Sequence, residues 1–96
     1  MVKHVVMFKL KDKTQKNIDF AVSILKDLNG RIETLRFLEI GLDFKKSERS
    51  YDILLITHFE NKAGLEVYAS HPNHLPVIEK MRELCSSSVV VDCVIS

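Results

Sequence analysis

One short stretch of the sequence, residues 68–74, gathers the side chains best suited to transfer a proton near neutral pH. It reads Tyr-Ala-Ser-His-Pro-Asn-His and so brings one phenol and two imidazoles together. A neutral imidazole can take a proton from an acidic carbon or hydroxyl, and a phenol can donate a hydrogen bond to the oxyanion that develops. Tyr68, His71 and His74 therefore predict acid/base chemistry on a small molecule.

The same stretch has a purely structural interpretation. Pro72 cannot continue a helix but suits the first turn of a new one, so residues 71–74 also describe a junction between two helices. A third interpretation is a zinc site in which His4, His71 and His74 supply three nitrogens. Histidine ligands on one helix are usually four residues apart, whereas His71 and His74 are three apart across a proline. We therefore expect no metal site, and because the sequence contains no GxGxxG and no P-loop motif, we expect no cofactor.

His4 and Asp52 are two further candidates for a pocket. His4 lies in an alternating segment, residues 2–10, and shares a strand face with apolar residues. A lone histidine on such a face is more often a hydrogen-bonded core residue. Antiparallel pairing of the first and third strands places Asp52 far from His4, so Asp52 can reach a pocket only from its far side. We expect His74 and Tyr68 to be catalytic, and His4, His71 and Asp52 to contribute to binding.

The elements that must position these residues follow from hydrophobic periodicity. Alternation or apolar runs predict strands over residues 2–10, 34–43, 51–59 and 88–95, and helical spacing predicts helices over 15–29, 62–70 and 73–84. Gly41 suggests a bulge or a close backbone approach, and residues 86–88 suggest a short linker. The order βαββαβ predicts an α+β, ferredoxin-like fold, with four antiparallel strands in the order 4-1-3-2 and helices on one face.

Two of these strands are apolar on both faces, which predicts a homodimer. The runs are Ile53-Leu54-Leu55-Ile56 and Val89-Val90-Val91. A sheet that carries helices on one face should instead alternate apolar and polar residues. The other face therefore needs a cover, and a second copy packed sheet to sheet would supply it with two-fold symmetry.

Composition restricts the class of protein. A chain of 96 residues is expected to form one domain, residues 1–96, and its 46% hydrophobic and 28% charged residues are ordinary for a soluble globule. A net charge of +1 argues against nucleic-acid and membrane partners. Cys85 and Cys93 form no CxxC motif and no signal peptide is visible, so we expect a cytoplasmic protein with two thiols.

Four segments together resemble the stress-responsive A/B barrel domain (Dabb) family. They are Val2-Lys3-His4-Val5-Val6-Met7-Phe8-Lys9-Leu10, Glu48-Arg49-Ser50-Tyr51-Asp52-Ile53-Leu54-Leu55, Tyr68-Ala69-Ser70-His71-Pro72-Asn73-His74 and Val91-Asp92. The resemblance implies a dimeric α+β barrel made of two ferredoxin-like halves. Most activities in the family are unassigned, but plant members include stress-associated proteins and a polyketide cyclase that works without a cofactor.

The resemblance also implies roles for individual residues. The cyclase's acid/base histidine and tyrosine match His74 and Tyr68, and the histidine of its opening strand matches His4. Two further pocket residues of the cyclase, a histidine and a tyrosine, fall at Asp52 and near Leu25 here. Plant polyketide cyclisation as such is therefore not expected.

The sequence leaves three hypotheses for function. The leading one is a small apolar pocket lined by histidine and tyrosine, with cofactor-independent acid/base chemistry on a small carbonyl or polyketide-like compound. The alternative is a non-catalytic ligand-binding or stress-protective homodimer. A third, a cofactor-free oxygenase, rests on fold analogy alone.

Overall fold

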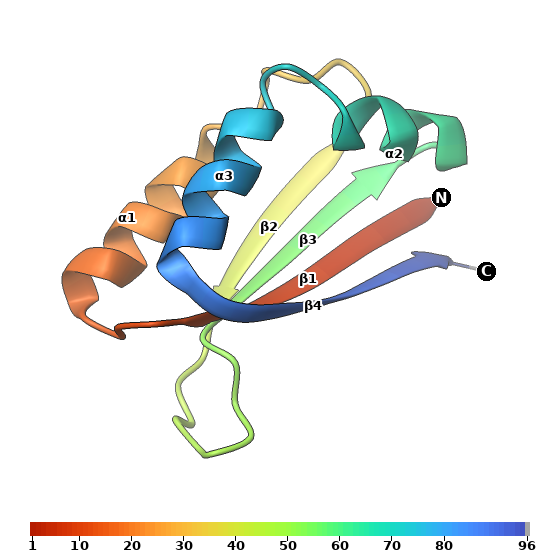
Figure 1. The fold of residues 1–96 in the computed structure, drawn as a ribbon. Coiled ribbons are helices and arrows are strands. Elements are labelled where there is room, and N and C mark those ends of the chain that lie inside the picture. The colour runs from red at the N-terminus through yellow and green to blue at the C-terminus, as the bar shows by residue number, and fades with distance from the viewer. Residues whose placement is uncertain (96) are drawn as a thin grey trace.

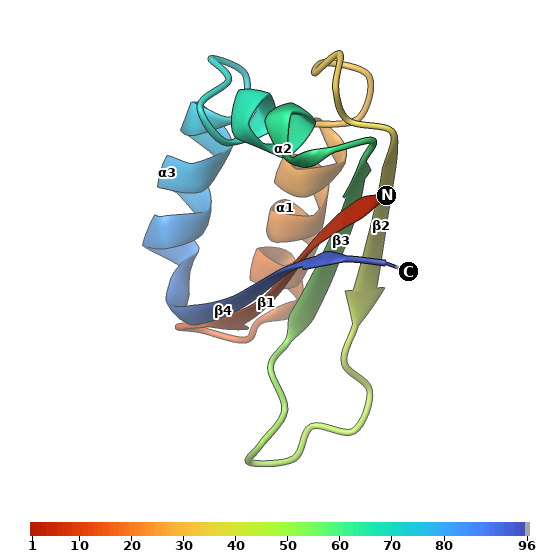
Figure 2. The ribbon, with the colours of Figure 1, turned by 90° about the vertical axis from the view of Figure 1, so that its right-hand side faces the viewer.

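The computed structural model describes residues 1–95, which form a four-stranded antiparallel sheet with three helices (Figure 1). The elements are β1 (Val2–Leu10), α1 (Gln15–Lys26), β2 (Phe37–Leu42), β3 (Ile53–Phe59), α2 (Lys62–Ala69), α3 (Leu75–Leu84) and β4 (Cys85–Val94). The strand order is β2-β3-β1-β4, and all neighbouring strands are antiparallel. The predicted ferredoxin-like fold is confirmed, and the helices lie on one side of the sheet (Figure 2).

The helix α1 forms and packs for reasons visible in its sequence. The hydroxyl of Thr14 accepts a hydrogen bond from the Asn17 N–H at 3.1 Å and so caps the first turn. Ala21 and Leu25, one turn apart, are buried against the sheet. The helix ends at Lys26, earlier than predicted, because the backbone tightens into turns with bonds to the third preceding residue.

Two local predictions about the strands are wrong. Residues 86–88 belong to β4 rather than to a linker, because the pairing of Ser87 and Ser88 with β1 outweighs the weak strand propensity of serine. At Gly41 the pairing of β2 with β3 continues without a shift, and an added Cβ would meet Leu54 at an ordinary 3.6 Å. The irregularity in the sheet lies instead between Lys9 and Leu10, where β1 pairs with β4.

The buried core consists of two clusters that meet beneath the helices. One comprises Val6, Leu10, Ala21, Leu25, Ile53, Leu55 and Met81, and the other comprises Val2, Leu28, Ile32, Phe59 and Tyr68. The first fixes α1 and α3 against the sheet, and the second fixes α2. Among residues 1–95, no helix is long and apolar enough to cross a membrane.

The outer face of the sheet, opposite the helices, is apolar at its centre. Directly paired residues share a face, and the pairing places Val5, Ile56 and Val91 in one row. The next row holds Met7, Leu54 and Val89. Met7 and Val91 are 42% and 61% exposed, so this face is open to solvent in the single chain.

Candidate functional site

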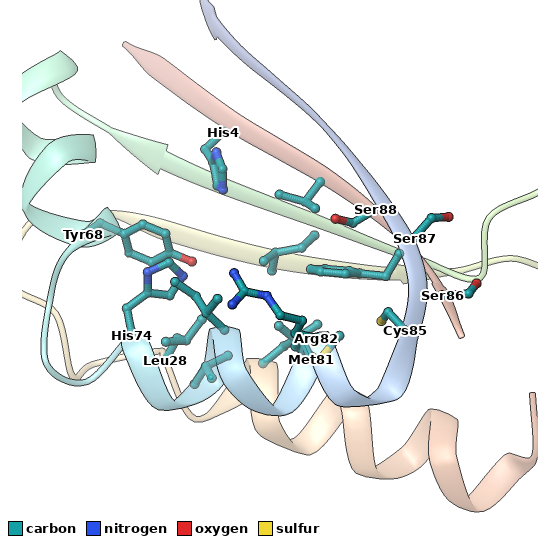
Figure 3. A pocket seen from close by; sticks show the side chains of 16 residues that line it. His4, Leu28, Tyr68, His74, Met81, Arg82, Cys85, Ser86, Ser87 and Ser88 are labelled. Atoms are coloured by element: carbon teal, nitrogen blue, oxygen red, sulfur yellow. The ribbon is translucent and has the colours of Figure 1, made fainter. Parts of the chain in front are cut away.

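A pocket of about 390 Å³ lies between the sheet and α3. Its sixteen lining residues are His4, Val6, Phe8, Leu25, Leu28, Leu55, Tyr68, His74, Val77, Ile78, Met81, Arg82, Cys85, Ser86, Ser87 and Ser88. Figure 3 shows His4, Tyr68 and His74 at one end and Cys85 with the three serines at the other. Apolar side chains and Arg82 form the walls between, and the volume lies in the range of small-molecule sites.

Tyr68 presents a buried hydroxyl to this pocket. The residue is 1% exposed, and its ring packs on Phe59 with centroids 5.0 Å apart, which fixes its direction. The hydroxyl has no hydrogen-bond partner among the described residues and points into the pocket (Figure 3). Burial raises the pKa of the Tyr68 phenol, so it stays protonated. Tyr68 is thus a neutral donor directed at the pocket.

His74 lies at the N-cap of α3 and presents a basic nitrogen. Its Nδ1 lies 3.2 Å from the carbonyl oxygen of Ala69; a carbonyl only accepts, so Nδ1 carries the proton. The lone pair is then on Nε2. Burial lowers the pKa of His74, and the neighbouring imidazoles of His4 and His71 act in the same direction. The ring is therefore neutral near pH 7 and can act as a base.

His4 reaches the same end of the pocket from β1. Its ring meets the Tyr68 ring edge-on, with centroids 5.9 Å apart. Its Nδ1 pairs with the carboxylate of Asp92, which lies directly opposite His4 in the β1–β4 ladder. Because a carboxylate accepts, Nδ1 is the donor in this pair.

Sequence analysis missed Asp92 and Arg82. Asp92 is an acidic residue within the apolar strand β4. Its pairing with His4 can be inferred only when the β1–β4 register is known, because that register places the two residues opposite each other. Arg82 lines the pocket from α3, two helical turns beyond His74, where an exposed basic residue is otherwise unremarkable.

The structure does not place His71 with Tyr68 and His74 in the lining of this pocket. Its Nε2 lies 3.3 Å from the Glu33 carboxylate, and its Nδ1 accepts a hydrogen bond from the Asn73 N–H at 3.0 Å. The Glu33 contact directs the ring toward the loop after α1, and the Asn73 bond holds it within the turn between α2 and α3. His71 thus matches the helix-junction interpretation.

Asp52 also lies away from the pocket. Its carboxylate accepts the Leu10 N–H at 2.8 Å and lies 3.4 Å from the Lys13 ammonium. It lines a separate cavity of about 280 Å³ at the end of β1 that is opposite His4. The structure therefore does not bring Asp52 together with His4, Tyr68 and His74, because these contacts hold its carboxylate at that end.

Other chemistry finds little support in the pocket. Burial raises the pKa of Cys85, so its thiol is protonated and a poor nucleophile. No three His, Cys, Asp or Glu side chains within residues 1–95 are placed to hold a metal ion. What the pocket does bring together is one phenol and two imidazoles, each imidazole with its Nδ1 already bonded.

Comparison with known proteins agrees with this architecture. The sequence model described as "Stress responsive A/B Barrel Domain" (Dabb) matches residues 2–95. The chain belongs to this family. A stress-response A/B barrel domain-containing protein of Arabidopsis thaliana, At5g22580, is 31% identical over 97 residues, covering 94% of this chain and 82% of that protein.

Two solved structures also have a fold similar to that of this chain. A dimeric protein of unknown function with a ferredoxin-like fold from Bacteroides fragilis is 29% identical, with a TM-score of 0.81 and coverage of 98% of this chain and 95% of that chain. A hydroxynitrile lyase from Passiflora edulis gives a TM-score of 0.87 at 19% identity, covering 99% of this chain and 93% of that chain. At that identity the likeness shows a shared fold.

Proposed function

We propose that this Dabb protein transfers protons on a small carbonyl compound, with His74 as the base and Tyr68 as the donor to the oxyanion. The observation that carries the proposal is the Tyr68 hydroxyl, which is buried, directed into the pocket and without a partner among residues 1–95. A buried hydroxyl that lacks a hydrogen bond costs about 1–3 kcal/mol. A carbonyl oxygen bound there would remove that cost.

The proposed step uses only the protein's own side chains. The Nε2 of His74 takes a proton from the carbon next to the carbonyl, the C–H electron pair forms a C=C bond, and the C=O π pair moves onto the oxygen. The resulting enolate oxygen accepts a hydrogen bond from Tyr68. The Nε2 of His4, whose ring Asp92 orients, accepts a hydrogen bond from a hydroxyl of the same molecule. Return of the proton from His74 to another carbon completes an isomerisation, whereas attack of the enolate carbon on a second carbonyl carbon, whose oxygen then takes the proton from His74, completes a cyclisation.

Exchange of α-protons in heavy water tests this step without knowledge of the natural substrate. We expect the wild type to accelerate deuterium uptake by 2,4-octanedione, followed by NMR, and the variants His74→Ala and Tyr68→Phe to lose this activity while staying folded. Tyr51→Phe is the matched control, because Tyr51 lies outside the pocket. Unchanged exchange in His74→Ala would end the assignment.

A non-catalytic, ligand-binding or stress-protective homodimer is the second candidate. It is supported by the exposed apolar outer face of the sheet and by the dimeric relative from Bacteroides fragilis. In either candidate we propose that two copies pack through these faces. Binding of ketones without proton exchange, together with a melting temperature that rises with protein concentration, would favour this second candidate.

A further inference from the structure

We infer that the pocket selects carbonyl compounds that also carry a carboxylate, and that Arg82 binds this carboxylate. The inference rests on the proposed function, because it names the substrate class for the same pocket. It uses one feature that proton transfer leaves unexplained: a guanidinium among otherwise uncharged or apolar walls.

Arg82 is the one Arg, Lys, Asp or Glu among the sixteen described residues that line the pocket. His4 and His74 are the other titratable bases there, and the lowered pKa keeps His74 neutral near pH 7. Asp92 pairs with His4 but lines a different cavity, together with Val2 and residues of α2. A bound molecule therefore meets the permanent positive charge of Arg82, which favours an anion.

The guanidinium lies near the reactive end of the pocket. The Cα of Arg82 follows His74 by about 12 Å along the helix. Long side chains on a helix lean back toward its N-terminus, and Figure 3 shows the guanidinium reaching toward His74 and Tyr68. A carboxylate on Arg82 would thus lie a few bonds from a carbonyl on Tyr68, as in an oxo acid, with the apolar tail toward Phe8 and Met81.

The present partner of Arg82 leaves it able to bind a ligand. Its Nη1 lies 3.7 Å from a carboxylate oxygen of Glu79, and the two side chains are 74% and 70% exposed. Such an exposed pair contributes little. The planar guanidinium can bind a carboxylate through two parallel N–H donors, which a lysine cannot do.

Displacement of a neutral fluorescent probe measures the carboxylate preference directly. N-phenyl-1-naphthylamine is bound to the full chain and displaced with octanoate or with its methyl ester. We expect Arg82→Gln to weaken displacement by octanoate about threefold to tenfold and to leave the ester unchanged. Glu79→Gln should strengthen the displacement of the probe by octanoate. Lys80→Gln removes the same charge from an exposed neighbour outside the pocket. It should leave displacement by octanoate and by the ester unchanged.

The outcomes separate this inference from the proposed function. If both ligands displace the probe and Arg82→Gln alters neither, the carboxylate inference is overturned while the pocket remains a binding site. Equal weakening by Arg82→Gln and Lys80→Gln would also overturn it, because the effect would then be general surface charge. If neither ligand displaces the probe from the wild type, pocket binding fails, and the proposed function with it.

Discussion

The imidazole of His74 lies over the ring of Tyr68, with centroids 4.1 Å apart and ring planes inclined by 30°. This contact joins the end of α2 to the start of α3 across the turn at Pro72. The same turn supplies the Ala69 carbonyl that fixes the Nδ1 proton of His74. One short segment therefore sets the direction of both the donor and the base, and it can do so only because the helix breaks there.

Removing the Tyr68 hydroxyl should affect stability and activity in opposite directions. In Tyr68→Phe a buried hydroxyl without a described partner disappears, so we expect the free energy of unfolding to stay level or rise by about 1 kcal/mol. The exchange rate should fall by about a hundredfold, as when an oxyanion donor is lost. Urea unfolding and NMR exchange measure the two effects. A clear loss of stability would mean that the hydroxyl has a structural partner.

The pH dependence of the reaction should report His74 as a neutral base. Burial lowers the pKa of His74 below its ordinary value of 6.5, so kcat/KM should be flat near neutral pH and decline only on the acid side of 6.5. A rate profile between pH 4.5 and 8 measures this. A decline of kcat/KM with its midpoint above pH 6.5 would contradict the assignment of His74 as the base.

The same pKa shift makes stability depend on pH. The unfolded chain binds a proton at His74 more readily than the folded chain does, so the free energy of unfolding should decline as pH falls through 6.5. His58, whose pKa is also lowered, mainly by burial, contributes with the same sign. We expect His74→Gln to lose part of this dependence in urea titrations at pH 7.5 and 5.5. An unchanged dependence in His74→Gln would place its origin elsewhere.

Sequence reasoning succeeded where one residue type and its local period decide the outcome. The strand containing His4 and the helix capped by Thr14 follow from periodicity and capping alone. It could not give the direction of the His71 side chain, because the direction of a side chain in a turn depends on partners such as Glu33, distant in the chain. It failed for Asp92 because the register between β1 and β4 depends on the whole sheet.

Asp92 should act on the reaction only through His4. Removing its carboxylate in Asp92→Ala should lower the share of His4 rings protonated at Nδ1, visible in nitrogen chemical shifts, and slow exchange about tenfold. Because Asp92 is half exposed, the loss of stability should stay below about 1 kcal/mol. In a chain that already carries His4→Gln, Asp92→Ala should have no further effect on the rate. An additive effect would show a separate role for Asp92.

The two faces of β4 provide a matched test of the proposed dimer. Val90 and Val91 are adjacent, of the same type and 56% and 61% exposed, but they point to opposite faces of the sheet. Val91 lies on the apolar outer face beside Val5, whereas Val90 lies on the helix side beside Val6. A lysine at position 91 would place a charge in the proposed interface, whereas a lysine at position 90 would remain in solvent.

We therefore expect Val91→Lys to dissociate the dimer and Val90→Lys to leave it intact. Light scattering after size-exclusion chromatography should give twice the 11.0 kDa chain mass for the wild type and Val90→Lys, and the single-chain mass for Val91→Lys. Dissociation should also lower the melting temperature, because the apolar outer face around Val5 returns to water. A dimer that survives Val91→Lys with its melting temperature unchanged would mean that the copies meet through another surface.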